Sequence, residues 1–305
     1  KIYKKIRPFI NQTPFLKCPD DIDNYFSTNL FFKCEFLQKS GSFKARGAVN
    51  NIISQDKIRF QKGITAVSAG NHAIAASFVA NLFKLNNKIF LYDSANPYRI
   101  SKCKSYNANI QFTNPKQAFI DASNAKNNGY YFIHPFDGSY TLQGSATIGL
   151  EIIEYFKTLD KKLDYIIISV GGGGLISGVS SYIKQLSPDT KVIGVEPEGA
   201  KGMSDSIKLG KPLDNVTVNS IADSLSAPLH LEYSYNIAKS VIDEMVTVTD
   251  DEMKEFMIYC FDNLRLMLEP ACVAGLAAIK YKINDKLNKK NTLVILCGSN
   301  IDKIT

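Results

Sequence analysis

Three short segments of this 305-residue chain combine residue types that could carry chemistry. The first, residues 40–48, places Lys44 after Phe43 and among small residues. A lysine whose stem is packed and whose amine is stripped of water has a lowered pKa and can form a Schiff base with a carbonyl compound. The alternative is an ordinary surface lysine, and this segment by itself leaves both interpretations open.

The second segment is a run of four glycines between an apolar stretch and the start of a predicted helix. The four are Gly171, Gly172, Gly173 and Gly174. Glycines let the backbone approach a ligand closely, and the N–H groups at a helix start attract an anion. The run lacks the Lys-Ser/Thr of a P-loop and the spaced glycines of a dinucleotide site. We interpret it as a phosphate cradle rather than a merely flexible turn.

The third segment, residues 68–72, joins a predicted strand to a predicted helix. Backbone N–H groups at such a helix start can hold a carboxylate, and Asn71 offers an amide donor to a phenolic oxygen. An ordinary helix cap, with Ser68 or Asn71 as the capping residue, explains the same residues. The segment therefore gains meaning only together with the other two.

The elements around these segments alternate between apolar, strand-like runs and longer amphipathic stretches. Strands are predicted at residues 30–35, 64–67, 88–92, 109–112, 130–133, 165–170, 192–195 and 292–297. Helices are predicted to begin near residues 72, 97, 115, 143 and 175. Such alternation is typical of an α/β protein with buried, mostly parallel strands and helices on both faces.

Parallel sheets of this kind bind ligands at the carboxyl ends of their strands, and each of the three segments follows a predicted strand. We expect two lobes. The smaller and mobile lobe is predicted at residues 56–140, and the larger at residues 1–55 plus 141–305.

Composition excludes several other functions. The net charge of +7 comes from scattered lysines, without the basic and aromatic stripe of a nucleic-acid groove, so no nucleic-acid partner is expected. The six cysteines contain no C-x-x-C pair, which predicts reduced thiols in a reducing compartment. The most apolar window, residues 165–183, is broken by the glycine run and cannot span a membrane. No signal-peptide pattern is present, and we expect a cytoplasmic protein.

Taken together, the three segments resemble the threonine/serine dehydratase (ammonia-lyase) family. They match it in order and spacing, and the resemblance extends from about Thr13 to Asn300. Further matches are His134-Pro135-Phe136-Asp137, Gln143-Gly144-Ser145, Gly194-Val195-Glu196-Pro197, Ile221-Ala222-Asp223-Ser224, Glu269-Pro270-Ala271 and Cys297-Gly298-Ser299-Asn300. The family belongs to the pyridoxal-phosphate (PLP) enzymes of fold type II, the tryptophan synthase β-like fold. The resemblance thus implies a two-lobed protein with open, mostly parallel sheets.

The resemblance also implies a role for each segment. Lys44 would carry PLP as a Schiff base, with Phe43 beside the ring, Asn71 bonded to the phenolic oxygen and Cys297 facing the pyridine nitrogen. The phosphate would be held by the larger lobe through Gly171, Gly172, Gly173, Gly174 and Leu175. The substrate carboxylate would be cradled by Ser68, Ala69, Gly70, Asn71 and His72. The family also places Glu269 near the cofactor.

The activity that the resemblance implies is β-elimination from a small amino acid. Lys44, displaced by the substrate amine, would take the Cα proton, and loss of the β-hydroxyl would convert L-threonine and/or L-serine to 2-oxobutyrate or pyruvate and ammonia. Serine racemases have a serine where Ala69 stands, and alanine has no proton to return to Cα, which favours elimination. A serine-racemase-like racemase, a dehydratase of another β-hydroxy amino acid such as 3-hydroxyaspartate, and a PLP-binding carrier or sensor stay open as alternatives.

In the resembled family an activating cation is bound by a glutamate, a backbone carbonyl and a second acidic residue. Glu196 and Ala200 match the first two positions, but Gly202 stands where the second acid is expected and Asp205 is out of register. A Mg²⁺, Ca²⁺ or K⁺ site is therefore only partly supported. Homodimers are common in the family, and we expect one here, with a small amino acid as ligand and no membrane partner.

Overall fold

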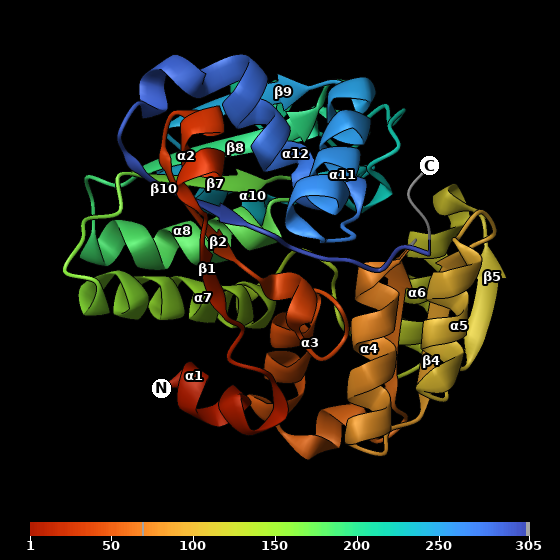
Figure 1. Cartoon of the computed structure of the whole chain (residues 1–305). Coiled ribbons are helices and arrows are strands. Elements are labelled where there is room, and N and C mark those ends of the chain that lie inside the picture. The colour runs from red at the N-terminus through yellow and green to blue at the C-terminus, as the bar shows by residue number, and fades with distance from the viewer. Residues whose placement is uncertain (69, 303–305) are drawn as a thin grey trace.

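A computed structural model describes residues 1–68 and 70–302 and confirms the predicted α/β fold, with two separate sheets (Figure 1). The larger sheet has six strands in the order β1-β2-β10-β7-β8-β9. Neighbouring strands run parallel except β1, which pairs antiparallel with β2. The strands are β1 (Phe15–Lys17), β2 (Asn29–Lys33), β7 (Tyr165–Ser169), β8 (Lys191–Pro197), β9 (Glu244–Val248) and β10 (Asn291–Ile295).

The smaller sheet has four parallel strands in the order β5-β4-β3-β6. The strands are β3 (Ile64–Ser68), β4 (Asn87–Tyr92), β5 (Ile110–Thr113) and β6 (Tyr131–Phe132). All four lie inside residues 56–140, the range predicted for the smaller lobe. The lobe boundaries themselves and the mobility of the smaller lobe stay predictions.

Helices and short turns connect the strands. The helices are α1 (Ile2–Ile6), α2 (Asp20–Phe26), α3 (Lys44–Ile53), α4 (Asn71–Leu82), α5 (Pro97–Ser105), α6 (Pro115–Asn127), α7 (Ser139–Thr158), α8 (Gly174–Leu186), α9 (Gly202–Leu209), α10 (Glu232–Val241), α11 (Asp250–Leu264) and α12 (Pro270–Ala278). The shorter helical turns are η1 (Arg7–Phe9), η2 (Glu35–Leu37), η3 (Lys57–Phe60), η4 (Glu198–Ala200), η5 (Asp223–Leu225), η6 (Ile279–Ile283) and η7 (Asn284–Leu287).

The four central strands of the larger sheet are mostly buried because helices cover both faces of the sheet. In β7, Ile166, Ile167 and Ile168 are fully buried, as expected for a parallel strand that is apolar on both sides. Figure 1 shows α7 and α8 against one face and α2, α11 and α12 against the other. The two ends of the chain meet in this sheet, where β2 pairs with β10.

Several helix starts follow directly from the local sequence. Helices α5 and α6 begin at Pro97 and Pro115, as predicted, since proline suits the first turn of a helix. The side chains of Asn96 and Asn114 cap these helices by accepting hydrogen bonds from backbone N–H groups. Helix α7 begins at Ser139, four residues before the predicted start.

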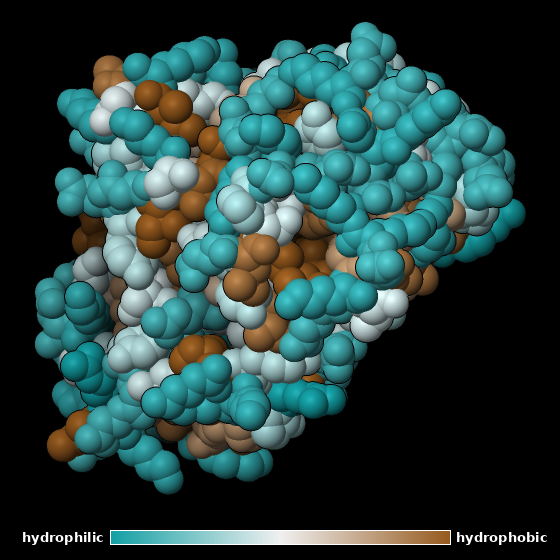
Figure 2. Space-filling model, turned by 90° about the vertical axis from the view of Figure 1, so that its left-hand side faces the viewer, coloured by the Kyte–Doolittle hydropathy of each residue, from teal (hydrophilic) through white to brown (hydrophobic). Residues whose placement is uncertain are grey.

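The face of the molecule drawn in Figure 2 is mainly polar. Figure 2 shows one face on which hydrophilic side chains cover most of the surface and hydrophobic atoms are visible between them. Among the helices of the described residues, none is both long and apolar enough to cross a membrane.

Candidate active site

Lys44 is the first residue of α3, after the loop that follows β2. Its Nζ donates a hydrogen bond to the backbone oxygen of Pro135 at 2.7 Å and lies 4.8 Å from the centre of the Phe43 ring. Burial lowers the pKa of this amine to about 8, although Cys297 and Glu269 oppose the shift. A lysine with this pKa is partly neutral near pH 7, as a nucleophile or proton acceptor has to be.

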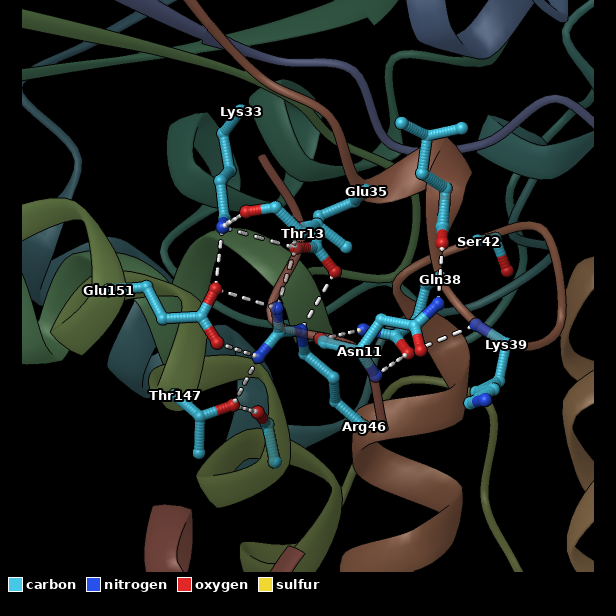
Figure 3. A network of polar contacts seen from close by, with 12 residues as sticks. Asn11, Thr13, Lys33, Glu35, Gln38, Lys39, Ser42, Arg46, Thr147 and Glu151 are labelled. Atoms are coloured by element: carbon cyan, nitrogen blue, oxygen red, sulfur yellow. Dashed lines mark hydrogen bonds and ion pairs between the residues drawn. The ribbon is translucent and has the colours of Figure 1, made fainter. Parts of the chain in front are cut away.

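A buried network of charges fixes the start of α3 (Figure 3). Arg46, in the first turn of the helix, donates to both carboxylate oxygens of Glu35 at 2.8 Å. It also donates to both oxygens of Glu151 on α7, at 2.8 and 2.9 Å. Lys33 on β2 completes the network through Glu151 at 2.5 Å. Two cations and two carboxylates thus neutralise one another, and one of the cations, Arg46, lies two residues after Lys44.

The glycine run forms the turn between β7 and α8 and lines a cavity. Gly173 has a φ of +91°, a left-handed conformation that glycine adopts readily. A Cβ atom on Gly172 would lie 2.2 Å from the Phe136 ring, so this position has no room for a side chain. The N–H groups at the start of the 13-residue helix α8 attract an anion. The turn therefore fits a phosphate group.

One cavity brings the predicted cofactor residues together. The predicted residues that line it are Phe43, Lys44, Asn71, Gly171, Gly172, Gly173, Gly174, Leu175, Glu269 and Cys297. The Ser169 hydroxyl on the same wall is buried and has no hydrogen-bond partner among the described residues. An amine, an anion cradle and an unsatisfied hydroxyl on one cavity fit a phosphorylated aldehyde such as PLP.

Asn71 begins α4, and its amide is held from both sides. The Nδ2 atom donates to Glu269 Oε1 at 2.6 Å and to Ser224 Oγ at 3.2 Å. The Oδ1 atom accepts from Asn300 Nδ2 at 2.7 Å. These partners determine which end of the amide is the donor, so an N–H bond of Asn71 is oriented on the cavity wall.

A second cavity shares Lys44 and Asn71 with the first and contains the predicted substrate residues. Ser68, Gly70 and His72 also line it, whereas Ala69 lies outside the described residues. The 12-residue helix α4 begins here, so its first N–H groups and its dipole favour a carboxylate. This arrangement supports the predicted carboxylate cradle.

The two histidines near Lys44 are uncharged. His72 Nε2 lies 2.8 Å from the backbone oxygen of Ile133, and burial together with the charge of Lys44 lowers its pKa to about 3. His134 Nδ1 accepts the backbone N–H of Asp137 at 3.0 Å, and burial lowers its pKa to about 3 as well. Neither side chain is an imidazolium near neutral pH, so neither can supply a proton as an imidazolium acid.

Cys297 follows β10 and is buried on the wall of the first cavity. Its backbone oxygen accepts the N–H of Phe43 at 3.1 Å, which links the end of β10 to the start of α3. Burial and a hydrogen bond with Cys297 raise the pKa of the neighbouring Cys272. The wall at this point therefore carries the side chain of Cys297, the residue predicted to face a pyridine nitrogen.

The structure adds residues to the second cavity to which the sequence assigned no role. They are Tyr92, Arg99, Phe119, Pro135, Phe136, Asp223 and Ser224. Arg99 is buried and pairs with both Asp223 and Glu269. An arginine near the start of a predicted helix is ordinarily a surface group. The one signal in the sequence that could have indicated a role in the site is its position after a strand, at the edge of a parallel sheet where ligands bind.

The residues of the predicted cation site do not fit a metal ion. The Glu196 carboxylate accepts the N–H groups of Met203 and Ser204 at 2.7 and 2.9 Å and so caps the N-terminus of α9. A Cβ atom at Gly202 would lie 2.5 Å from His230 Nε2, which leaves no room for the missing acid. Within residues 1–68 and 70–302, no group of three or more His, Cys, Asp or Glu could hold a metal. Ala200 is buried nearby in η4.

A two-sheet α/β fold with an amine, an anion cradle and an oriented amide on one cavity is an arrangement suited to PLP. The chain belongs to a family described as pyridoxal-phosphate dependent enzyme, whose model matches residues 6–298. This match confirms the predicted cofactor.

Individual relatives refine the comparison. Phenylserine dehydratase of Ralstonia pickettii is 38% identical over 303 residues, which covers 99% of this chain and 91% of the relative. Serine racemase of Arabidopsis thaliana is 32% identical over 307 residues, with 98% and 91% covered. The crystal structure of a T.th. threonine deaminase has a TM-score of 0.91 at 28% identity and covers 99% of this chain and 97% of that chain. The chain is thus similar to PLP-dependent dehydratases and racemases.

Proposed function

We propose that the chain is a PLP-dependent ammonia-lyase that acts on small β-hydroxy amino acids, with L-threonine and/or L-serine as substrates. The overall reaction converts the amino acid to a 2-oxo acid and ammonia. The elimination releases one water, and hydrolysis of the resulting enamine consumes one. The observation that carries the proposal is the meeting of Lys44, Asn71 and the glycine run on one cavity that adjoins the start of α4.

Each part of the site has a task in this reaction. PLP, when bound, supplies an electron sink that makes the Cα proton of an amino acid acidic. The N-terminus of α4 and the residues Ser68, Gly70 and His72 would hold the substrate carboxylate. Lys44 Nζ would accept the Cα proton, which its lowered pKa of about 8 allows near neutral pH.

Elimination is favoured over racemisation by the groups available to return a proton. A racemase needs a second acid or base on the face of Cα opposite the lysine. The sequence has Ala69 where serine racemases have a serine, and alanine has no such proton. The pKa values of His72 and His134, both about 3, leave neither charged enough to act instead.

A second candidate substrate carries an aromatic ring on Cβ. Tyr92, Phe119 and Phe136 line the second cavity and could pack against such a ring. The similarity to a phenylserine dehydratase supports the same idea. Aromatic pairs contribute about 0.5–1.5 kcal/mol beyond the burial of their area, enough to change substrate preference severalfold.

The experiment is a substrate panel assayed for 2-oxo acid and ammonia. It contains the L and D forms of serine, threonine, 3-phenylserine and 3-hydroxyaspartate, with chiral chromatography to detect racemisation. We expect 2-oxo acid from L-serine or L-threonine, and none from a Lys44→Ala variant that still folds. Racemised serine without 2-oxo acid would overturn elimination, and no turnover of any compound would favour a PLP carrier or sensor.

Phe119→Ala tests the second candidate in the same panel. If the aromatic wall selects the substrate, this variant loses activity on 3-phenylserine and keeps its activity on serine. We also propose a cytoplasmic homodimer, which cell fractionation and sedimentation of the purified protein would test.

A further inference from the structure

Arg99 is a buried cation on the wall of the second cavity, and the proposed reaction gives it no task. It lies on α5, which follows β4 of the smaller sheet. Its ion-pair and hydrogen-bond partners within the described residues belong to segments around the larger sheet. Its guanidinium pairs with Asp223 on η5 and with Glu269 before α12, the latter at 3.4 Å. Its Nε donates to the backbone oxygen of Asn300 at 2.9 Å.

The contact with Glu269 leads directly to the predicted cofactor residue Asn71. Glu269 is buried, and its Oε1 accepts Nδ2 of Asn71 at 2.6 Å while its Oε2 faces Arg99. Burial raises the pKa of Glu269, and Arg99 is the main group that opposes this. Arg99 therefore helps to keep Glu269 ionised, and an ionised carboxylate is the stronger acceptor for the amide of Asn71.

Other groups also act on Glu269. Asp223 raises its pKa, Cys272 on α12 lies close enough to interact with it, and Lys44 at the start of α3 interacts with it from across the cavity. Of these, only Arg99 is both a permanent cation and within ion-pair distance of the Glu269 carboxylate. The charge state of Glu269 should therefore depend mainly on Arg99.

Arg99 also packs on the predicted carboxylate cradle. A Cβ atom on Gly70 would lie 2.5 Å from the Nη1 atom of Arg99 and 2.7 Å from its Cδ atom. The guanidinium is thus in contact with the turn between β3 and α4. Because two carboxylates already neutralise it, Arg99 has no net charge left for a substrate group.

We propose that Arg99 is a positioning residue. By pairing with the carboxylate of Glu269 it holds the amide of Asn71 in place on the wall of the cofactor cavity, and it joins α5 to that side of the cavity. The inference rests on the proposed function only in that Asn71 contacts PLP. Arg99 itself touches neither the cofactor nor the reacting atoms.

The test compares Arg99→Gln with the wild type from pH 6.5 to 9. Without Arg99 the Glu269 carboxyl retains its proton to higher pH and becomes a poorer acceptor for Asn71. We expect the dissociation constant of PLP to be about tenfold higher than in the wild type at pH 7, a difference that corresponds to ~1.4 kcal/mol. The ratio of the two constants should shrink as pH rises. The kcat should follow the same trend, while KM for the amino acid changes little.

Three further variants separate positioning from simple loosening of α5. Asn96→Ala removes the side-chain cap of α5 and a hydrogen bond to Asp302, but it leaves Arg99, Asp223 and Glu269 unchanged, so any loss should be independent of pH. Arg99→Lys keeps a cation beside Glu269. The ratio of its PLP dissociation constant to that of the wild type should therefore depend little on pH. Arg99→Gln/Glu269→Gln has no carboxyl at position 269 to titrate, so its PLP affinity should have the pH dependence of the wild type. This double variant also keeps the test available if Arg99→Gln alone does not fold.

Two results would overturn the proposal. One is a ratio of PLP dissociation constants, Arg99→Gln to wild type, that does not change with pH. The other is a double variant whose PLP affinity differs from that of the wild type in its pH dependence. A loss confined to KM for 3-hydroxyaspartate would also overturn it and would make Arg99 a binding group for a substrate carboxylate. The PLP titration uses no substrate. If no hydroxy amino acid is turned over, the proposed function fails while the affinity ratio still tests Arg99.

Discussion

Replacing Arg46 by methionine should be one of the most damaging single changes to the stability of this protein. The guanidinium donates four hydrogen bonds to two carboxylates, and the side chains of Lys33, Glu35, Arg46 and Glu151 are all inaccessible to solvent (Figure 3). With Arg46 present the four charges sum to zero. Arg46→Met keeps most of the volume but leaves two buried carboxylates facing a single ammonium group, that of Lys33.

The magnitude follows from this uncompensated charge. Removing one partner from a buried ion pair costs about 3–5 kcal/mol, because the remaining charge is neither solvated nor paired. Domains have a free energy of unfolding of about 5–15 kcal/mol, so the loss would be about a fifth of the total or more. Arg46→Met/Glu151→Gln restores neutrality with Lys33 and Glu35. The double variant should therefore be less destabilised than the sum of the single variants, by about 0.5–3 kcal/mol.

The pH dependence of the stability difference between Arg46→Met and the wild type provides an independent check of this argument. Burial alone would raise the pKa of Glu35, but Arg46 and Lys33 outweigh this effect and lower it. A carboxylate with a lowered pKa stabilises the fold above its unfolded-state pKa of about 4.5, and this stabilisation is lost as pH falls through the folded-state value. The deficit of Arg46→Met should therefore persist from neutral pH down to about pH 4.5 and shrink only below that value.

The assay is urea unfolding of the PLP-free protein, followed by circular dichroism. Lys39→Met is the matched control, since Lys39 is exposed on the loop before α3 and its loss should change stability by less than about 0.5 kcal/mol. A deficit below about 1 kcal/mol for Arg46→Met at pH 7, or strictly additive effects in the double variant, would refute the argument that this network is a neutralised buried cluster.

Three further predictions concern the cavity and the histidines. The rate at which the PLP-free enzyme takes up PLP should rise with pH around a midpoint near 8, because only the neutral amine of Lys44 attacks; a stopped-flow rate that is flat from pH 6.5 to 9.5 would contradict this. Gly172→Ala should weaken PLP binding about tenfold or more, since its Cβ would lie 2.2 Å from the Phe136 ring; an unchanged dissociation constant would argue against a tightly packed cradle. Burial lowers the pKa of His230 to about 4, so stability should fall as pH drops from about 6.5 to 4. His230→Gln should reduce that slope by up to ~1.4 kcal/mol per pH unit, and an unchanged slope in urea titrations would rule this out.

The sequence predicted those parts of the fold that leave a local pattern. The buried strand β7 is a continuous apolar run, and the prolines at the starts of α5 and α6 are strong local signals. In contrast, β9 was not predicted, because this edge strand, Glu244–Val248, is only partly buried and mixes polar with apolar residues. Helix α11 was missed too, although its capping box of Thr249 and Glu252 is a recognisable signal.

The residues of the site likewise fall into those that a local sequence pattern predicts and those that it does not. Lys44, Asn71 and the glycine run were found because their types and order form a motif. The roles of Arg46 and Arg99 depend on partners far away in the sequence, such as Glu151 and Glu269, and no local pattern reports those contacts. The sequence supported the cation site only in part, again because the deciding contact joins residues that are distant in the sequence. Only the packing of His230 against Gly202 shows that the position has no space for an acidic side chain.

The most direct test of the account is to identify the residue to which PLP is covalently attached. The purified protein is incubated with PLP, reduced with borohydride, digested and mapped by mass spectrometry, with Lys44→Ala treated in parallel. We predict a single phosphopyridoxyl adduct on the peptide that contains Lys44, and no adduct in the variant. An adduct on a different lysine, or a protein that binds no PLP at all, would contradict the central claim.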